Sequence, residues 1–179
     1  MTSQLRVDKI TPIDGVPSGG GGGVIQVVHT EKTDVDFSTT ANLNTKATIT
    51  GLTATITPKF STSKVLVMMN LCVGASGDTT GGGTILRDST AIGIADASGN
   101  RTRNTFGFGV ATSSSLWITE SVSRTILDSP NTTSATTYSV KIGGNGGVSI
   151  YINREGRNND NATDTTIGVS SLTLMEISA

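Results

Sequence analysis

The sequence predicts an all-β protein, a single β-sandwich of jelly-roll type that follows an extended N-terminal arm. Three observations carry this prediction. Short runs of alternating apolar residues, about nine in number, follow one another at spacings of roughly eight to twelve residues. Turn-forming Gly, Asn and Asp residues separate these runs, and no run has the apolar spacing of an amphipathic helix. A meander barrel is the alternative, because periodicity alone does not order the strands.

Five consecutive glycines, Gly19 to Gly23, divide the chain. We expect residues 1–18 to form the arm, residues 19–23 a flexible linker, and residues 24–179 one β-sandwich domain. The arm has no helical apolar stripe, and its two prolines keep it extended. It is too short to bury its own apolar side chains, so we expect it to anchor the domain to another protein. The expected anchoring residues are Leu5, Val7, Ile10, Ile13 and Val16.

Two strands are predicted early in the domain. The first, residues 24–30, begins directly after the glycines. In the second, residues 47–57, apolar residues alternate with threonines until Pro58 ends the run. This alternation is typical of a strand with one buried face.

The strand predicted at residues 64–75 is apolar on both faces. In an antiparallel sandwich only one face of a strand meets the opposite sheet, so the second face is expected to contact a neighbouring subunit. The last predicted strand, residues 169–177, has the same character. The expected oligomer interface therefore contains Leu66, Met68, Cys72, Leu172 and Leu174.

Turn signals predict two hairpins. An Asp-Ser-Thr turn would join residues 84–87 to residues 91–95. The cluster of four glycines and one asparagine at residues 143–147 would join residues 135–142 to residues 148–153. Two further strands are expected at residues 104–111 and 116–127.

Composition excludes several classes of partner. The formal net charge is −1, so the chain carries no basic excess for nucleic acid or for an anionic membrane. No apolar run approaches the length that spans a bilayer, and the first residues do not resemble a signal peptide. Cys72 is the only cysteine, which leaves no intrachain disulfide and no cysteine-rich zinc site. We expect no nucleic acid partner, no membrane insertion and no cofactor.

No motif predicts an enzyme. Any Ser-His-Asp arrangement would have to use His29, the only histidine, and no Gly-x-Ser-x-Gly elbow accompanies it. The glycines at 143–147 lack the Lys-Ser/Thr of a phosphate-binding loop, and a predicted strand follows them. Residues 158–164 offer oxygen ligands for calcium but lack the EF-hand Gly and Glu, so a solvated loop is the favoured interpretation. We predict no catalytic residue and no metal ligand.

Arginines in two predicted loops are the candidates for contact with a ligand. Forked guanidinium groups suit the carboxylate or phosphate of a host surface glycan, although surface ion pairs are their commoner use. Trp117 would stack on a sugar ring or fill a core or interface, and its apolar neighbours favour the latter. The candidate surface-binding loops contain Arg101, Arg103, Arg154, Arg157, Asn158 and Asn159.

A family resemblance rests on short segments spread through most of the chain. They are LRVDKI at 5–10, DGVP at 14–17, GLTATITP at 51–58, SKVLV at 63–67, LDSP at 127–130, SATTY at 134–138, YINR at 151–154 and LTLMEI at 172–177. These segments resemble small, tail-fibre-like virion structural proteins of tailed bacteriophages, of the marine cyanophage type. The resemblance implies a noncatalytic virion component assembled in the host cytoplasm. It also implies a homotrimer of β-sandwiches that the N-terminal arm attaches to another phage structural protein.

The first functional hypothesis is a short tail-fibre or adhesin module, with a host surface glycan as a further expected partner. The alternative is a capsid decoration or head-fibre protein at threefold positions, which predicts many copies per particle. A polysaccharide-cleaving tail tip is less favoured, because glycosidases need two carboxylates placed across a cleft. The sequence does not bring such a pair together.

Overall fold

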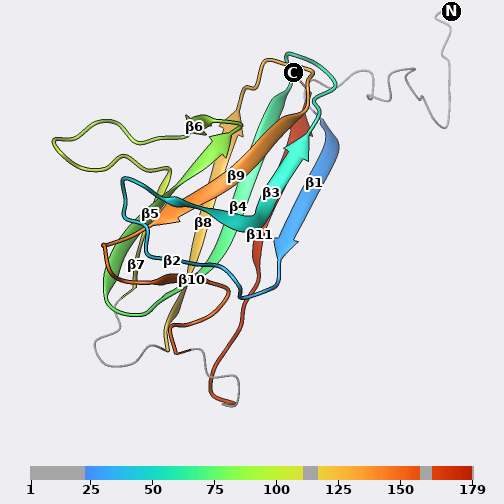
Figure 1. Ribbon diagram of the computed structural model, residues 1–179. Coiled ribbons are helices and arrows are strands. Elements are labelled where there is room, and N and C mark those ends of the chain that lie inside the picture. The colour runs from blue at the N-terminus through green and yellow to red at the C-terminus, as the bar shows by residue number, and fades with distance from the viewer. Residues whose placement is uncertain (1–22, 111–116, 158–162, 179) are drawn as a thin grey trace, which may run out of the picture.

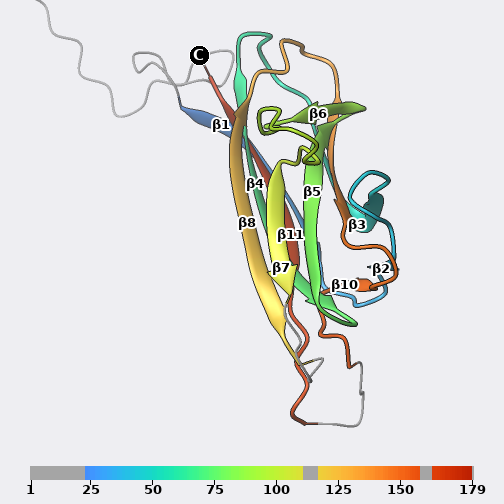
Figure 2. The ribbon, with the colours of Figure 1, turned by 90° about the vertical axis from the view of Figure 1, so that its left-hand side faces the viewer.

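The protein is a β-sandwich of two antiparallel sheets packed face to face (Figures 1 and 2). The computed structural model describes residues 23–110, 117–157 and 163–178, and these ranges contain no helix. The predicted all-β class is therefore confirmed. One sheet contains β1 (Val24–Lys32), β2 (Ser38–Thr39), β4 (Lys64–Ala75), β8 (Thr119–Asp128), β10 (Ile150–Ile152) and β11 (Ser170–Ile177). The other contains β3 (Ala47–Ile56), β5 (Thr79–Arg87), β6 (Thr90–Ile92), β7 (Phe106–Val110) and β9 (Thr136–Gly143).

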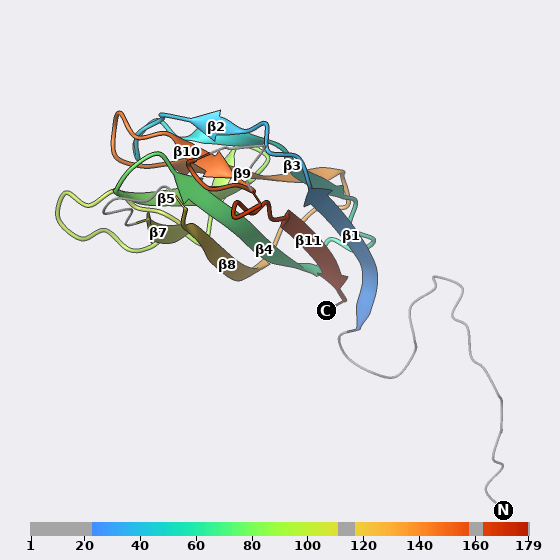
Figure 3. The ribbon, with the colours of Figure 1, turned by 90° about the horizontal axis from the view of Figure 1, so that it is seen from below.

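The first sheet is organised around the long strand β4. β8 pairs along almost the whole of one edge of β4, while β11 and β10 follow each other along the opposite edge. β1 lies beyond β11, and the two-residue strand β2 lies beyond β10. Figure 3, seen from below, shows β8, β4, β11 and β1 side by side. These four strands form one continuous surface.

The second sheet has the order β3, β9, β5. β7 and then β6 follow each other along the free edge of β5. All strand pairs in both sheets are antiparallel. The core lies between the sheets, because every second side chain of each long strand points inward. Its members include Leu52, Ile56, Val67, Leu71, Ile85, Tyr138, Ile142 and Leu174.

Most predicted strands are present, with bounds shifted by a few residues. β4 has the predicted bounds, and β3 ends one residue earlier than predicted. The first predicted hairpin is confirmed, since β5 and β6 pair across Asp88 and Ser89. Asp88 adopts the left-handed conformation that such a turn needs, with a φ of 52°. Its carboxylate accepts a hydrogen bond of 3.0 Å from the backbone N–H of Thr137, which ties the turn to β9.

The second predicted hairpin is wrong. β9 pairs with β3 and β5, whereas β10 pairs with β2 and β4 in the other sheet. The glycines at 143–147 instead cross between the sheets, and a Cβ atom added at Gly143 would lie 2.4 Å from the carbonyl oxygen of Asn42. Side chains from both strands point into the core. The prediction failed because two strands in opposite sheets, facing each other across the core, show the same alternation of apolar and polar residues as two strands that pair.

Two of the three consecutive glycines in β5 make room for aromatic rings of β7. Gly81 pairs with Phe108, and Gly83 pairs with Phe106. A Cβ atom added at Gly81 or Gly83 would lie about 2 Å from Cζ of the paired ring, at 2.1 and 2.0 Å respectively. The glycines therefore lie in a strand against aromatic rings, which explains why the sequence contains them.

Polar side chains close both long edges of the sandwich. On one edge, Gln26 donates a hydrogen bond of 2.7 Å to the carbonyl oxygen of Thr57, linking β1 to the end of β3. On the other edge, Asp128 of β8 accepts hydrogen bonds from Tyr138 of β9 at 2.7 Å and from Arg87 of β5 at 2.8 Å. Asp128 and Tyr138 are both buried. The two sheets are thus joined by directional bonds as well as by apolar packing.

Candidate interaction surface

The outer face of the first sheet carries a row of apolar side chains across four strands. The register places Val27 of β1 beside Met175 of β11, Met175 beside Leu66 of β4, and Leu66 beside Leu127 of β8. Val27 and Leu127, at the two ends of the row, are 55% and 57% exposed. Adjacent apolar residues extend this row, and we call the whole group the apolar band. It consists of Val24, Val27, Leu66, Met68, Leu127, Met175 and Ile177.

The predicted interface residues fall into two groups, those that point outward and those that point into the core. Leu66 and Met68 lie on the outer face of β4, as alternation requires, and Met68 is exposed. Leu172 and Leu174 were assigned to the interface wrongly. Both are 0% exposed and lie in the core, where they pair with Met69 and Val67 of β4. In β11, Met175 and Ile177 are the apolar residues that point outward. The strand register shows which residues of β1 and β4 lie beside them.

Cys72 lies on the outer face of β4, but the chain itself covers it. Gly168 packs so closely on the thiol that an added Cβ atom would lie 2.7 Å from Sγ. Burial raises the pKa of the Cys72 thiol above its usual value. Cys72 is therefore only partly exposed, and Gly168 lies over its thiol.

Beyond the apolar band, the same face becomes polar. His29 shares a hydrogen bond of 2.7 Å with Thr173 and lies 3.3 Å from the carboxylate of Glu31. Ser123 donates a hydrogen bond to Asn70 on the neighbouring strand. A hollow of about 200 Å³ lies among these polar rows, with Met68, Asn70, Ser123 and Thr173 in its wall. The face therefore combines projecting apolar side chains with a small polar hollow.

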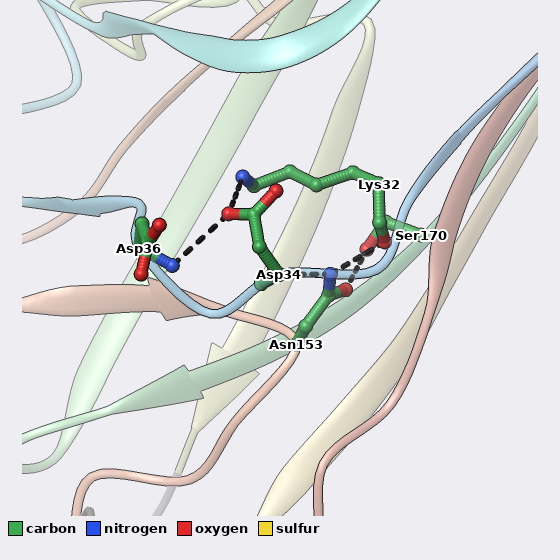
Figure 4. Close-up of polar contacts among 5 residues, drawn as sticks. All are labelled: Lys32, Asp34, Asp36, Asn153 and Ser170. Atoms are coloured by element: carbon green, nitrogen blue, oxygen red, sulfur yellow. Dashed lines mark hydrogen bonds and ion pairs between the residues drawn. The ribbon is translucent and has the colours of Figure 1, made fainter.

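A cluster of polar groups fixes the far end of the first sheet, and three of its members, Lys32, Asn153 and Ser170, are buried (Figure 4). The Lys32 ammonium is buried and pairs with the carboxylate of Asp34, and this hydrogen bond lowers the pKa of Asp34. The Asn153 amide donates to the carbonyl oxygens of Lys32 at 2.6 Å and Asp34 at 2.8 Å. It also accepts a hydrogen bond of 2.7 Å from Ser170. These bonds tie β1, β11 and the segment after β10 together, which is a structural role.

No group of three His, Cys, Asp or Glu side chains able to hold a metal occurs in the ranges that the structure describes. Likewise, no helix in these ranges is long and apolar enough to cross a membrane.

The candidate arginine loops lie at different ends of the sandwich. Arg101 and Arg103 belong to the long loop between β6 and β7, and Arg154 and Arg157 to the segment after β10 (Figure 1). Arg101 donates to Ser98 at 2.7 Å, and Arg103 donates to the carbonyl oxygen of Ala95 at 2.6 Å. The first loop borders a hollow of about 640 Å³ whose wall includes Asp96, Asn104 and Arg124.

The second arginine pair stacks on aromatic rings. The Arg154 guanidinium lies 3.7 Å from the centre of the Tyr151 ring, and that of Arg157 lies 4.2 Å from the Trp117 ring. Arg157 also forms an ion pair of 3.0 Å with Asp164. The structure therefore brings Trp117 and Arg157 together, although they are distant in sequence. It does not bring the two arginine loops into one site.

Some predicted site residues lie outside the described residues. They are the anchoring residues Leu5, Val7, Ile10, Ile13 and Val16, together with Asn158 and Asn159. Their assignments stay predictions.

Comparison with known proteins does not assign the chain to a family. No family model matches the chain, and no curated protein matches it. We therefore base the functional interpretation on the apolar band.

Proposed function

We propose that this chain is a noncatalytic structural protein of a bacteriophage particle. It acts as a short tail-fibre or adhesin module, forms a homotrimer, and is attached to another phage structural protein by its N-terminal arm. The resemblance of its sequence segments motivates the proposal. The observation that carries it is the apolar band, which an isolated sandwich would leave in water. A contiguous exposed apolar patch of this kind often marks an interaction site.

The strand order supports a jelly-roll topology. Leaving aside the short strands β2, β6 and β10, the first and last strands pair, as β1 with β11. The second pairs with the second-last, β3 with β9. The remaining nested pairs are β4 with β8 and β5 with β7. Viral capsid and lectin domains use this architecture, although a fold alone does not assign a function.

The proposed mechanism is geometric. When several copies associate, binding of the first arm to the particle raises the effective concentration of the others, so the assembly binds more tightly than one arm alone. Each apolar anchoring side chain that becomes fully buried contributes about 1.5 to 3 kcal/mol before the cost of ordering the arm. The loops at the ends of the sandwich are then free to face a host surface glycan.

Electron microscopy of purified particles with an antibody against this chain tests the proposal. Label confined to the tail would support a fibre or adhesin, whereas label spread over the head would support a capsid decoration protein. Particles without label would overturn the proposal in both forms. Incubation of the purified protein with host polysaccharide tests the noncatalytic part, because new reducing ends would contradict it.

A further inference from the structure

We infer that the apolar band is the surface on which a second copy of this chain docks. This inference rests on the proposed function, which predicts an oligomer. It adds the residues through which the copies would make contact. The occupant of the band is then neither the particle protein nor a host molecule.

The two outer faces of the sandwich differ in a way that supports a protein contact on one of them. The outer face of the second sheet presents Thr53 and Thr55 of β3 beside Ser139 and Thr137 of β9. Thr55 and Thr137 share a hydrogen bond of 2.9 Å across the strands. This is the polar face of a sheet that meets water. The first sheet instead presents the apolar band.

Charge and shape on the face with the band favour a second copy as the partner. None of the members of the band is charged, and Lys64 at its margin is hydrogen-bonded to Ser129 at 2.7 Å. The formal net charge of −1 gives little repulsion between copies. The same face carries both the projecting side chain of Leu127 and the hollow beside Met68. In the proposed trimer, the projection of one copy would fit the hollow of the next, a head-to-tail contact that can close into a ring.

The area of the face shows how far the contact would have to extend. Four strands about 4.8 Å apart and four outward rows about 6.8 Å apart cover on the order of 500 Å². A stable interface buries about 800 Å² per partner, so the contact must include the polar rows and some surface beyond them. The apolar band would then form the core of the contact, and His29, Glu31 and Ser123 would form its polar rim.

The last residue of the glycine linker lies beside the band. The Gly23 carbonyl oxygen accepts a hydrogen bond of 3.0 Å from Ser178, and the Gly23 N–H donates to the Ser178 hydroxyl at 3.2 Å. These bonds fix Gly23, the first residue that the structure describes, next to Val24 of the band. Copies that meet on their bands would bring their Gly23 residues near one another, which suits several arms binding one phage structural protein.

The test is the association of the full-length chain in solution, measured by sedimentation equilibrium and native mass spectrometry. Val27→Lys and Leu127→Lys each place a charge in the band at a position more than half exposed in one copy, so the fold should persist. Thr53→Lys on the opposite face is the matched control. We expect the wild-type chain and T53K to associate equally. V27K and L127K should each raise the dissociation constant about 30-fold or more, the effect of removing an interface hot spot.

Far-UV circular dichroism and urea unfolding of the dissociated variants separate loss of contact from loss of fold. If the lysine variants unfold, Val27→Ser and Leu127→Ser replace them. We then expect these serine variants to associate more weakly than the wild type and T53K. A wild-type chain that stays monomeric at high micromolar concentration would overturn the inference. So would folded band variants that associate as tightly as T53K. Band variants that associate normally would overturn only this inference and would leave the virion proposal standing. Particles that the antibody does not label would overturn the virion proposal but would leave the contact between copies in solution intact.

Discussion

Replacement of Tyr138 by phenylalanine removes one of the hydrogen bonds that join the two sheets at the edge formed by β8. The Tyr138 hydroxyl donates a hydrogen bond of 2.7 Å to Asp128, whose carboxylate also receives Arg87 at 2.8 and 2.9 Å. Tyr138 is 0% exposed, so water cannot replace the lost donor. A hydrogen bond to a charged group contributes about 1.5 to 3 kcal/mol, and we expect Y138F to lose an amount in this range.

Urea unfolding at one fixed protein concentration measures this loss. With a slope of about 2 kcal/mol per molar urea, the midpoint should fall by about 1 M. Tyr151→Phe is the control, because Tyr151 is only partly buried and its ring under Arg154 is retained. A loss below about 0.5 kcal/mol in Y138F would refute the reasoning, since it would make the bond no stronger than an ordinary surface contact.

The same residue predicts a dependence on alkaline pH. Burial, and then the hydrogen bond to Asp128, raises the pKa of Tyr138 above its usual value of about 10. The folded chain therefore holds this proton more tightly than the unfolded chain, so the contribution of Tyr138 is complete below about pH 10 and is lost as the pH rises further. The difference in unfolding free energy between the wild type and Y138F should shrink above pH 10. A difference that stays constant up to pH 11 would contradict this assignment.

Three further predictions concern packing and the arm. Leu174→Ala should cost about 2 to 5 kcal/mol because it leaves a cavity in the core. Met175→Ala, on the outer face, should cost under about 1 kcal/mol in dissociated protein, and urea unfolding that reversed this order would contradict the assigned faces. Gly83→Ala should lower the melting temperature strongly because the added methyl group meets an aromatic ring and a backbone carbonyl. Gly109→Ala, with open space around its Cβ position, should change it little, and equal shifts would count against this explanation. Deletion of residues 1–18 should leave a folded oligomer that no longer joins the particle, and normal incorporation of the truncated chain would show that the arm is not the anchor.

The error at Leu172 and Leu174 shows how a local pattern misleads. Glu176 has the same parity as these two leucines, and a glutamate in a strand normally marks the face toward water. Here Glu176 is fully buried, and its carboxylate accepts backbone N–H bonds from Lys59 at 2.7 Å and Phe60 at 3.4 Å. These donors come from a turn more than a hundred residues away in the sequence. No local signal announces such a partner, so the burial of Glu176 and the true orientation of the strand depend on the tertiary structure.

The sequence by itself determined the class of the fold and the position of most strands, because the period-two alternation and the turn residues are local properties of the chain. It also predicted correctly that Leu66 and Met68 turn away from the core. Only the tertiary structure decided which strands pair, that residues 143–147 cross between sheets, and that Val27, Met175, Leu66 and Leu127 align in one row. Pairing and register depend on contacts between distant segments. The same alternation fits many arrangements, and only the packing of the whole core selects one of them.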